Sequence, residues 1–369
     1  MIIMKVPFVS LARQYEELRN ELVEEFDRVG RSGIYIMGES LELFEREAAD
    51  FCGTRFAVGL ANGSDALFLT LKALGIQSGD EVITSPNSFI ATAWTIVAAG
   101  AKPVFVDVKD DYNIDPEQIS KSITVKTRAI MPIHLTGRVA DMDAITFIAE
   151  KYGLPVIEDA AQALGAEYKN KRAGSLGLVG CFSLHPLKNL GVYGDGGLLT
   201  TNREDIYRKI LKLRNHGLIN RDECELWGYN SRLDTLQAAF ASVKLRKLNQ
   251  WNSRYREIAS YYRNALKNYV WTPDDQTYEK PAYHNFVIRT PERDALRTYL
   301  NQCGIETRIH YPIPIHLQKC AQTLGYKKGD FPVVESQVET MLSLPIYPEL
   351  RDDEIRYVIE AIQSFKFKY

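Results

Sequence analysis

The stretch FAVGLANGSDALFLTLKALGIQSGDEVITS, residues 56–85, decides the fold class. FAVGL (56–60) is a short apolar run typical of a buried strand, and DALFLTLKAL (65–74) follows it with helical spacing. EVITS (81–85) is a second run of the first kind. A strand, a helix and a strand in close succession predict a βα unit with parallel strands.

The same alternation continues toward the C-terminus. Apolar, β-branched runs recur at 102–108, 128–133 and 154–159, and a helical pattern covers 141–153. We therefore expect an α/β fold whose mostly parallel sheet is covered by helices.

Beyond the sheet region the pattern changes. Residues 231–267 predict one long helix, because no proline or glycine interrupts them. HNFVIRT (284–290) then reads as a strand, and prolines cluster in HYPIPIH (310–316). We expect a large domain over 1–250 and a smaller C-terminal α+β domain over 251–369, with the N-terminal helix free to pack on the small domain.

Composition limits the function classes. The 369 residues are 45% hydrophobic and 25% charged, as in an ordinary globular protein. A net charge of −2 gives no attraction to nucleic acid or to an anionic membrane, and no apolar run has membrane-spanning length. The five cysteines form no CxxC pair, so neither a metal site nor a disulfide framework is expected. We expect a cytoplasmic protein.

A lone lysine stands in the turn-rich stretch HPLKNLGVYGDGG (185–197). Proline and glycine at this density predict a tight loop, although a lysine in an arbitrary loop is most often a plain surface residue. The carboxyl ends of parallel strands meet at one edge of a sheet, where ligands bind. Two other segments place polar groups there: Asp159 and Gln162 in VIEDAAQALGA, and Gly63, Ser64 and Asp65 in ANGSDALF.

These groups match the needs of pyridoxal 5'-phosphate (PLP), which requires an amine, an acid partner for its ring nitrogen and donors for its phosphate. Asp159 would favour the protonated ring nitrogen, and the free amides at the start of a helix would hold the phosphate. Lys188 would form the Schiff base and then move a proton. Taken singly, Asp159 fits a water-facing acid and Ser64 an N-cap. A dinucleotide loop is the rival, but no G-x-G-x-x-G follows the first strand.

The chain resembles the DegT/DnrJ/EryC1/StrS family of sugar aminotransferases, which have the fold type I architecture of aspartate aminotransferase. The resemblance covers nearly the whole chain. Its motifs include GTRFAVGLANGSDALFLTLKALGIQSGDEVITSPNSFIAT, MPIHLTGRVADMD, VIEDAAQALGAEY, FSLHPLKNLGVYGDGG, GYNSRLDTLQAAF and RIHYPIPIH.

The resemblance implies a role for each cofactor-site residue. Lys188 would bind PLP covalently, Asp159 would pair with the ring nitrogen, and Gln162 would bond the ring hydroxyl. Phe89 would stack on the ring, where other members often have tyrosine or tryptophan. Asn230 would reach the phosphate from a neighbouring subunit, which implies a homodimer with shared sites. The phosphate would be held by Gly63, Ser64, Asp65 and Ser183.

The resemblance also points to a substrate side of the site. His185 departs from the tyrosine or phenylalanine common in this loop, and a lone histidine is more often structural than catalytic. Arg232 fits a helix-start ion pair as well as a substrate contact. The HYPIPIH segment fits a rigid proline turn equally well. With these alternatives open, the candidate substrate residues are His185, Arg232, His310, Tyr311 and His316.

The family implies two half-reactions, in which glutamate converts PLP to pyridoxamine 5'-phosphate and a nucleotide-linked keto-sugar then takes the amine. NSRLD (230–234) resembles members that act at C3 of the hexose, which favours a 3-keto sugar linked to dTDP or UDP. A 3-keto uronate stays open through Arg232. The alternatives are a C4 aminotransferase, a sugar dehydratase, which would carry histidine in place of Lys188, and a non-catalytic regulator on the same scaffold.

Overall fold

A computed structural model describes residues 4–367. Its central feature is a sheet in two hydrogen-bonded groups, which parallel bridges between Ile130 and Val156 and between Ile133 and Asp159 join edge to edge. In spatial order its strands are β1 (Phe56–Leu60), β9 (Gly197–Thr201), β8 (Val179–Ser183), β5 (Ile157–Asp159), β4 (Thr127–Ile130), β2 (Glu81–Thr84) and β3 (Lys102–Phe105).

The sheet is mostly parallel, as predicted. β5 pairs parallel to β8, and β2 pairs parallel to both β3 and β4. Only β9 runs against its neighbours, because it pairs antiparallel to β1 and to β8. The carboxyl ends of the other strands therefore meet at one edge, which is where such sheets bind ligands.

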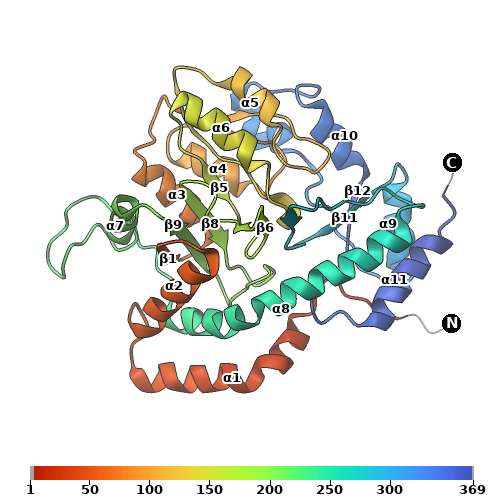
Figure 1. Cartoon of the computed structure of the whole chain (residues 1–369), viewed down its shortest axis with the longest axis horizontal. Helices are drawn as coiled ribbons and strands as arrows, with labels where there is room; N and C mark the ends of the chain where they lie inside the picture. The colour runs from red at the N-terminus through yellow and green to blue at the C-terminus, as the bar shows by residue number, and fades with distance from the viewer. Residues whose placement is uncertain (1–3, 368–369) are drawn as a thin grey trace.

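Helices cover both faces of the sheet (Figure 1). Alternate strand residues pack on opposite faces of the sheet, since strand side chains alternate with a period of two: Leu198 packs on one face and Leu199 on the other. One face packs against α2 (Glu39–Cys52), α5 (Pro116–Ser122), α6 (Met142–Tyr152) and α8 (Thr235–Leu266). The other face packs against α3 (Gly63–Ala73), α4 (Ala91–Ala98) and α7 (Glu204–Leu213).

The long helix predicted over 231–267 is α8, which begins later than expected. Asp234 has an extended backbone with ψ of 145°, so the helix starts at Thr235. Along α8, Trp251 packs into the core of the sheet region, whereas Tyr255 packs into a second core built by the C-terminal part of the chain. The two cores therefore meet near the predicted boundary, and the division at residue 250 stays a prediction.

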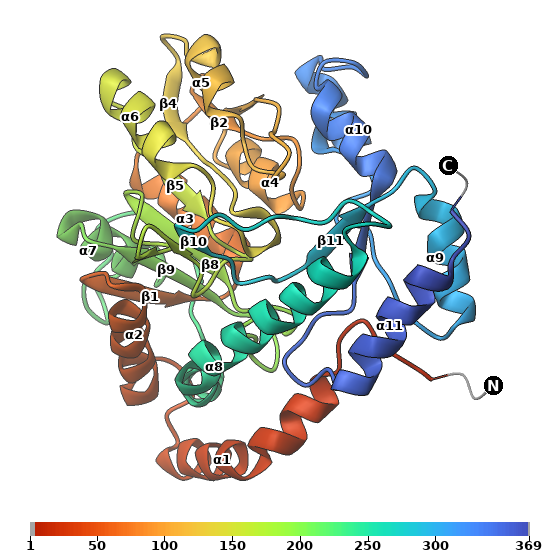
Figure 2. The same cartoon turned by 45° about the vertical axis from the view of Figure 1, so that its right-hand side comes forward.

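The second core lies around a two-stranded antiparallel sheet (Figure 2). Its elements are β11 (Phe286–Arg289), β12 (Met341–Leu344), α9 (Arg293–Gln302) and α11 (Asp352–Ser364). The N-terminal helix α1 (Leu11–Ser32) contacts both cores, because Leu18 and Leu22 pack with the sheet region while Arg13 forms a 2.7 Å ion pair with Glu354 of α11.

Several short elements lie between the longer helices and strands. Ile315 packs with Phe105 and Val334 in a further apolar cluster, so part of the C-terminal chain lies against the sheet region. The short elements are η1 (Leu135–Gly137), β6 (Glu167–Tyr168), β7 (Lys171–Arg172), β10 (Glu279–Lys280), η2 (Ile315–Leu317), η3 (Lys319–Leu324) and α10 (Pro332–Thr340). Across residues 4–367, no helix combines the length and apolar character needed to cross a membrane.

Candidate active site

A cavity of about 380 Å³ lies at the carboxyl edge of the sheet. The ends of β5 and β8, the start of α3, the segment before α4 and two stretches of the C-terminal chain line it. Most of the residues expected from the sequence meet here: Gly63, Ser64, Phe89, Asp159, Gln162, Ser183, His185, Lys188, His310 and Tyr311.

Lys188 and Asp159 form the polar centre of this cavity. Burial lowers the pKa of Lys188 to about 8, and the charge of Asp159 opposes that shift. Asp159 is 4% exposed, and its carboxylate accepts hydrogen bonds from the Thr92 hydroxyl (2.6 Å) and the Ala161 amide (3.2 Å). Burial raises the pKa of Asp159, while these two bonds and the charge of Lys188 lower it. A cationic ring nitrogen beside Asp159 would add a further opposite charge and favour the carboxylate.

A lowered lysine pKa does not by itself identify the reactive amine. Burial also lowers the pKa of Lys244 to about 8. The Lys244 amine, however, donates a 2.6 Å hydrogen bond to the carbonyl of Gly191, and Lys244 does not line the cavity. Lys188 is distinguished because it lines the cavity together with Asp159.

The turn before α3 provides a narrow anion cradle. A Cβ atom on Gly63 would lie 2.8 Å from the Cβ of Ser183, so only glycine lets this turn approach the end of β8. The side chain of Asn62 caps α3 by accepting from the Asp65 amide at 2.8 Å. The amides of Gly63 and Ser64 belong to the first turn, where the helix itself supplies no acceptor. They suit a phosphate group.

The opposite wall holds Gln162 against the C-terminal chain. The side-chain oxygen of Gln162 accepts from the Thr136 amide at 2.8 Å, and its NH₂ group donates to the Tyr311 hydroxyl at 3.3 Å. The ring of Phe89 is exposed and lies 6.0 Å from that of Tyr311. His310 is anchored through Nδ1, which lies 2.9 Å from the Ser343 hydroxyl. Burial and the charge of Lys188 lower the pKa of His310 to about 4.

Four expected residues do not line the cavity. The Asp65 carboxylate accepts from the Ser231 hydroxyl at 2.6 Å, and its amide already donates to the Asn62 side chain at 2.8 Å. Asn230 is exposed, and the Arg232 guanidinium donates to the Asn215 side chain at 2.8 Å. His316 is only 1% exposed and lies 3.0 Å from Glu335. The structure does not bring His316 together with the other candidate substrate residues, because its ring packs against Phe331; its substrate contact stays a prediction.

Sequence reasoning missed several residues of the cavity. Thr92 was visible in NSFIAT, but nothing in that motif indicates that its hydroxyl bonds a carboxylate 67 positions away. His284 begins the HNFVIRT strand pattern and lines the cavity, where burial, followed by the charge of Lys188, holds its pKa well below the usual value. Asn62, Ser88 and Asp195 are the other polar lining residues that the sequence analysis did not name.

The donor set fits PLP. The cavity offers an amine, a buried carboxylate, a hydrogen-bonding side chain in Gln162, and a cradle that a Cβ on Gly63 would fill. PLP supplies an electron sink for a carbanion next to the amine that it carries. In the described part of the chain, no group of three or more His, Cys, Asp and Glu side chains has the geometry of a metal site. The α/β fold and this site together define a PLP-dependent enzyme of fold type I.

Comparison with known proteins specifies the family. The model of the DegT/DnrJ/EryC1/StrS aminotransferase family matches residues 16–363. The chain is 43% identical to a pleiotropic regulatory protein of Geobacillus stearothermophilus, over 98% of this chain and 99% of the relative. It is 41% identical to the dTDP-3-amino-3,4,6-trideoxy-alpha-D-glucose transaminase of Streptomyces venezuelae, over 98% and 96%.

A solved structure agrees with these matches. The crystal structure of DesV from S. venezuelae, in complex with a ketimine intermediate, superposes with a TM-score of 0.96 at 42% identity, covering 97% of this chain and 98% of that one. The chain therefore belongs to the DegT/DnrJ/EryC1/StrS aminotransferase family. It is an aminotransferase, and its cofactor is PLP.

Proposed function

We propose that the protein transfers the amino group of glutamate to C3 of a keto-hexose linked to dTDP or UDP. The observation that carries the proposal is one cavity that Lys188 and Asp159 both line, with the charge of Asp159 acting on the Lys188 amine. Two features favour C3: the NSRLD sequence at 230–234 and the name of the S. venezuelae relative, a 3-amino-sugar transaminase.

The residues of this chain have separate tasks in that reaction. With a pKa near 8, Lys188 carries a substantial neutral fraction at neutral to slightly alkaline pH, which suits a group that moves a proton between two carbons. Asp159 holds a positive charge at the ring nitrogen and so favours electron withdrawal there. His284 and His310 stay neutral at this pH, and we assign them, with His185, to orienting the substrate.

We further propose a homodimer in which Asn230 of one subunit completes the site of the other. The segment that follows α7 extends away from the body of the molecule (Figure 1). It carries Trp227, whose side chain is 95% exposed, as well as the exposed Asn230. A second apolar stretch, Ile34 to Ile36, is also exposed. Apolar surface of this kind marks a protein interface.

Absorbance spectroscopy tests the proposal. Purified protein with added PLP should show a band that disappears in Lys188→Ala, and glutamate should convert it to the pyridoxamine phosphate spectrum. The glutamate-treated enzyme is then mixed with dTDP- and UDP-linked 3-keto or 4-keto hexoses, and the amino-sugar is identified by mass spectrometry. Amination of only the 4-keto compounds would support the C4 alternative. A protein without a lysine-dependent band would be a regulator on this scaffold, as the name of the G. stearothermophilus relative suggests.

A further inference from the structure

A buried pair of asparagines adjoins Lys188. Asn189, the next residue in the loop after β8, is 4% exposed, and Asn252 of α8 is 1% exposed. The Nδ2 group of Asn189 donates to Oδ1 of Asn252 at 3.0 Å. Burying an amide is costly unless it is hydrogen-bonded, so the further bonds of this pair decide what it contributes.

Asn189 connects the loop of Lys188 to the segment that carries His284. Its Nδ2 group also donates to the carbonyl of Ala282 at 2.8 Å. Ala282 lies two residues before His284, and Lys188 and His284 both line the cofactor cavity of about 380 Å³. The bond therefore links two segments of the cavity that are 93 positions apart in the sequence.

Asn252 connects the pair to the chain after Gln162. Its Nδ2 group donates to the carbonyl of Leu164 at 3.0 Å, and Gln162, two residues earlier, lines the cofactor cavity. A Cβ atom on Gly165 would lie 2.4 Å from Nδ2 of Asn252, so a larger residue there would displace the asparagine. The glycine at this position is thus matched to the side chain of Asn252.

The chemistry of the partners fixes the direction of these bonds. A backbone carbonyl only accepts, so the carbonyls of Ala282 and Leu164 each require the NH₂ end of an asparagine. With both NH₂ groups so placed, Oδ1 of Asn252 is the acceptor for Asn189. Turning either amide over would break two of the three bonds. The network therefore has one arrangement.

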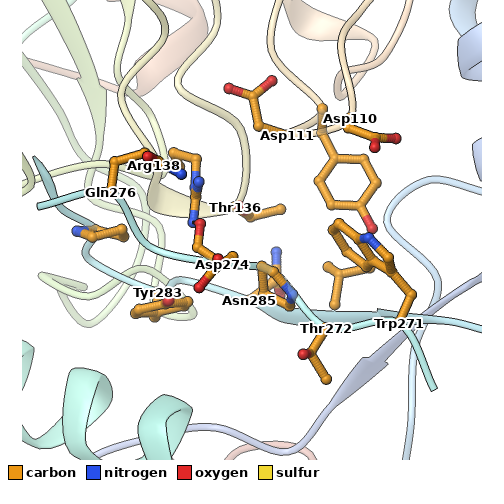
Figure 3. Close-up of a pocket in the computed structure, with 14 residues that line it drawn as sticks. Asp110, Asp111, Thr136, Arg138, Trp271, Thr272, Asp274, Gln276, Tyr283 and Asn285 are labelled. Carbon is orange, nitrogen blue, oxygen red and sulfur yellow. Dashed lines mark hydrogen bonds between the residues drawn. The ribbon is translucent and has the colours of Figure 1, made fainter. Parts of the chain in front are cut away.

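The segment of His284 depends on such bonds because a hollow lies behind it. A cavity of about 250 Å³ is lined by Tyr283 and Asn285, which Figure 3 shows among the side chains around it. His284, between them, lines the cofactor cavity instead. A side chain beside a void loses contacts on that side, so packing alone supports this segment weakly.

We propose that Asn252 is a positioning residue for the aminotransferase reaction. Through Asn189 it fixes the loop that holds Lys188, and the same network keeps the segments of Gln162 and His284 in place around that loop. The inference rests on Lys188 as the amine that binds PLP, as in the proposed function. It adds a residue of α8 that does not itself line the cofactor cavity.

Capture of PLP by the cofactor-free, full-length protein tests the proposal. Only a neutral amine attacks PLP, so the rate at which the absorbance band appears should have a pH midpoint that follows the pKa of Lys188, about 8 in the wild type. Asn252→Ala and Asn189→Ala each release the loop and admit water to the amine, which should move this midpoint upward by roughly half a unit to one unit. The double variant should move it no further than the larger single shift, because both substitutions break the same bond.

Two further observations separate position from other causes. The other titratable side chains that line the cavity are the same in all variants, namely Asp159, Asp195, His185, His284, His310 and Tyr311. A moved midpoint therefore reports the place of the Lys188 amine. In addition, conversion of the band at saturating glutamate should slow about tenfold or more in Asn252→Ala, as for a displaced reacting group, while the half-saturating glutamate concentration changes less than about twofold.

Tyr262→Phe is the matched control. The Tyr262 hydroxyl, also buried on α8, donates to the carbonyl of Pro345 at 2.9 Å, and its ring packs in the second core. Its loss removes a buried bond of the same kind away from the cofactor cavity. Urea unfolding should show that Asn252→Ala and Tyr262→Phe are both destabilised, whereas only the asparagine variants should move the midpoint.

The inference is overturned if Asn252→Ala and Asn189→Ala, folded by circular dichroism, keep the wild-type midpoint, or if Tyr262→Phe moves it equally. Should Asn252→Ala fail to fold, Asn189→Ala decides alone, since it leaves the bond from Asn252 to Leu164 intact. A wild type without a lysine-dependent band would overturn the proposed function and this inference with it. A wild-type band whose midpoint no variant moves would overturn this inference alone.

Discussion

The cofactor cavity and the segment from Arg214 to Asp234 differ in how their functional side chains are placed: those of the cavity are largely enclosed, and those of the segment are exposed. In the cofactor cavity, Asp159 at the end of β5 and Lys188 in the loop after β8 line one space, and Thr92 bonds the carboxylate. In the segment, Trp227 and Asn230 face solvent. Seven of the nine residues expected to hold the cofactor therefore line one cavity of one chain, whereas Asp65 and the exposed Asn230 do not line it.

The largest expected effect comes from the amine. Lys188→Ala should abolish the PLP-dependent absorbance band and lower kcat by at least roughly 10³-fold, because both the covalent attachment and the proton carrier are lost. Lys244→Met is the control, since Lys244 has the same lowered pKa but bonds to Gly191 outside the cavity. Loss of the band in Lys244→Met, with its fold intact by circular dichroism, would show that the cavity does not single out Lys188.

A smaller effect is expected at the buried carboxylate. Asp159→Asn keeps the shape and the bond from Thr92 but removes the charge opposite the ring nitrogen, so kcat should fall roughly 10²- to 10³-fold with PLP still covalently bound. Thr92→Val loses one hydroxyl and should cost about tenfold, which initial rates at saturating glutamate would measure. An equal loss in both variants would mean that the orientation of Asp159, and not its charge, matters.

The residues that line the cofactor side of the cavity could be predicted from the sequence, because they lie at a strand end, in the loop after a strand or at the start of a helix. A parallel sheet brings such ends together whatever lies between them. The shared location of Lys188, Asp159 and Gly63 therefore follows once the order of strands and helices along the chain is predicted correctly. β9 runs antiparallel to both of its neighbours, β1 and β8, so the carboxyl ends of β1 and β8 still lie at the same edge.

The substrate side could not be predicted in the same way. His316 and His310 stand six residues apart in one proline-rich stretch, yet His310 lines the cavity and His316 packs behind it against Glu335. Their difference depends on the tertiary position of α10, for which a short motif carries no signal. His284 was missed because a strand pattern predicts which residues alternate and gives no information on which strand end borders a cavity.

Subunit mixing tests whether Asn230 acts from a neighbour. Asn230→Ala and Lys188→Ala should each have greatly reduced activity, and mixed dimers should regain it, because one of their two sites holds both native residues. Random exchange should restore about a quarter of the wild-type activity, measured as amino-sugar formed per protein. Native mass spectrometry would confirm that mixed dimers form. Mixed dimers without recovered activity would show that Lys188 and Asn230 act in the same chain, or that Asn230 has no role in the site.

The smallest expected effect is on the stability of the cofactor-free protein. The folded-state pKa of Lys188, about 8, lies below its ordinary value of 10.5, so the unfolded chain binds more protons between these two values. Stability contributed by this group therefore rises from pH 8 to 10.5, and the cost of its burial is fully present below pH 8. Lys188→Met should raise the free energy of unfolding by roughly 1–3 kcal/mol at pH 7, a gain that shrinks toward pH 10.5. Because the substitution also removes a cation beside Asp159, the gain should lie at the lower end of this range.

Urea unfolding of both proteins between pH 7 and pH 10.5 measures the difference. Lys328→Met, at a side chain that is 78% exposed, is the control and should show no such dependence on pH. A gain that stayed constant with pH would show that the amine is solvated in the folded protein, and the cavity would then lack the dry environment that its chemistry requires.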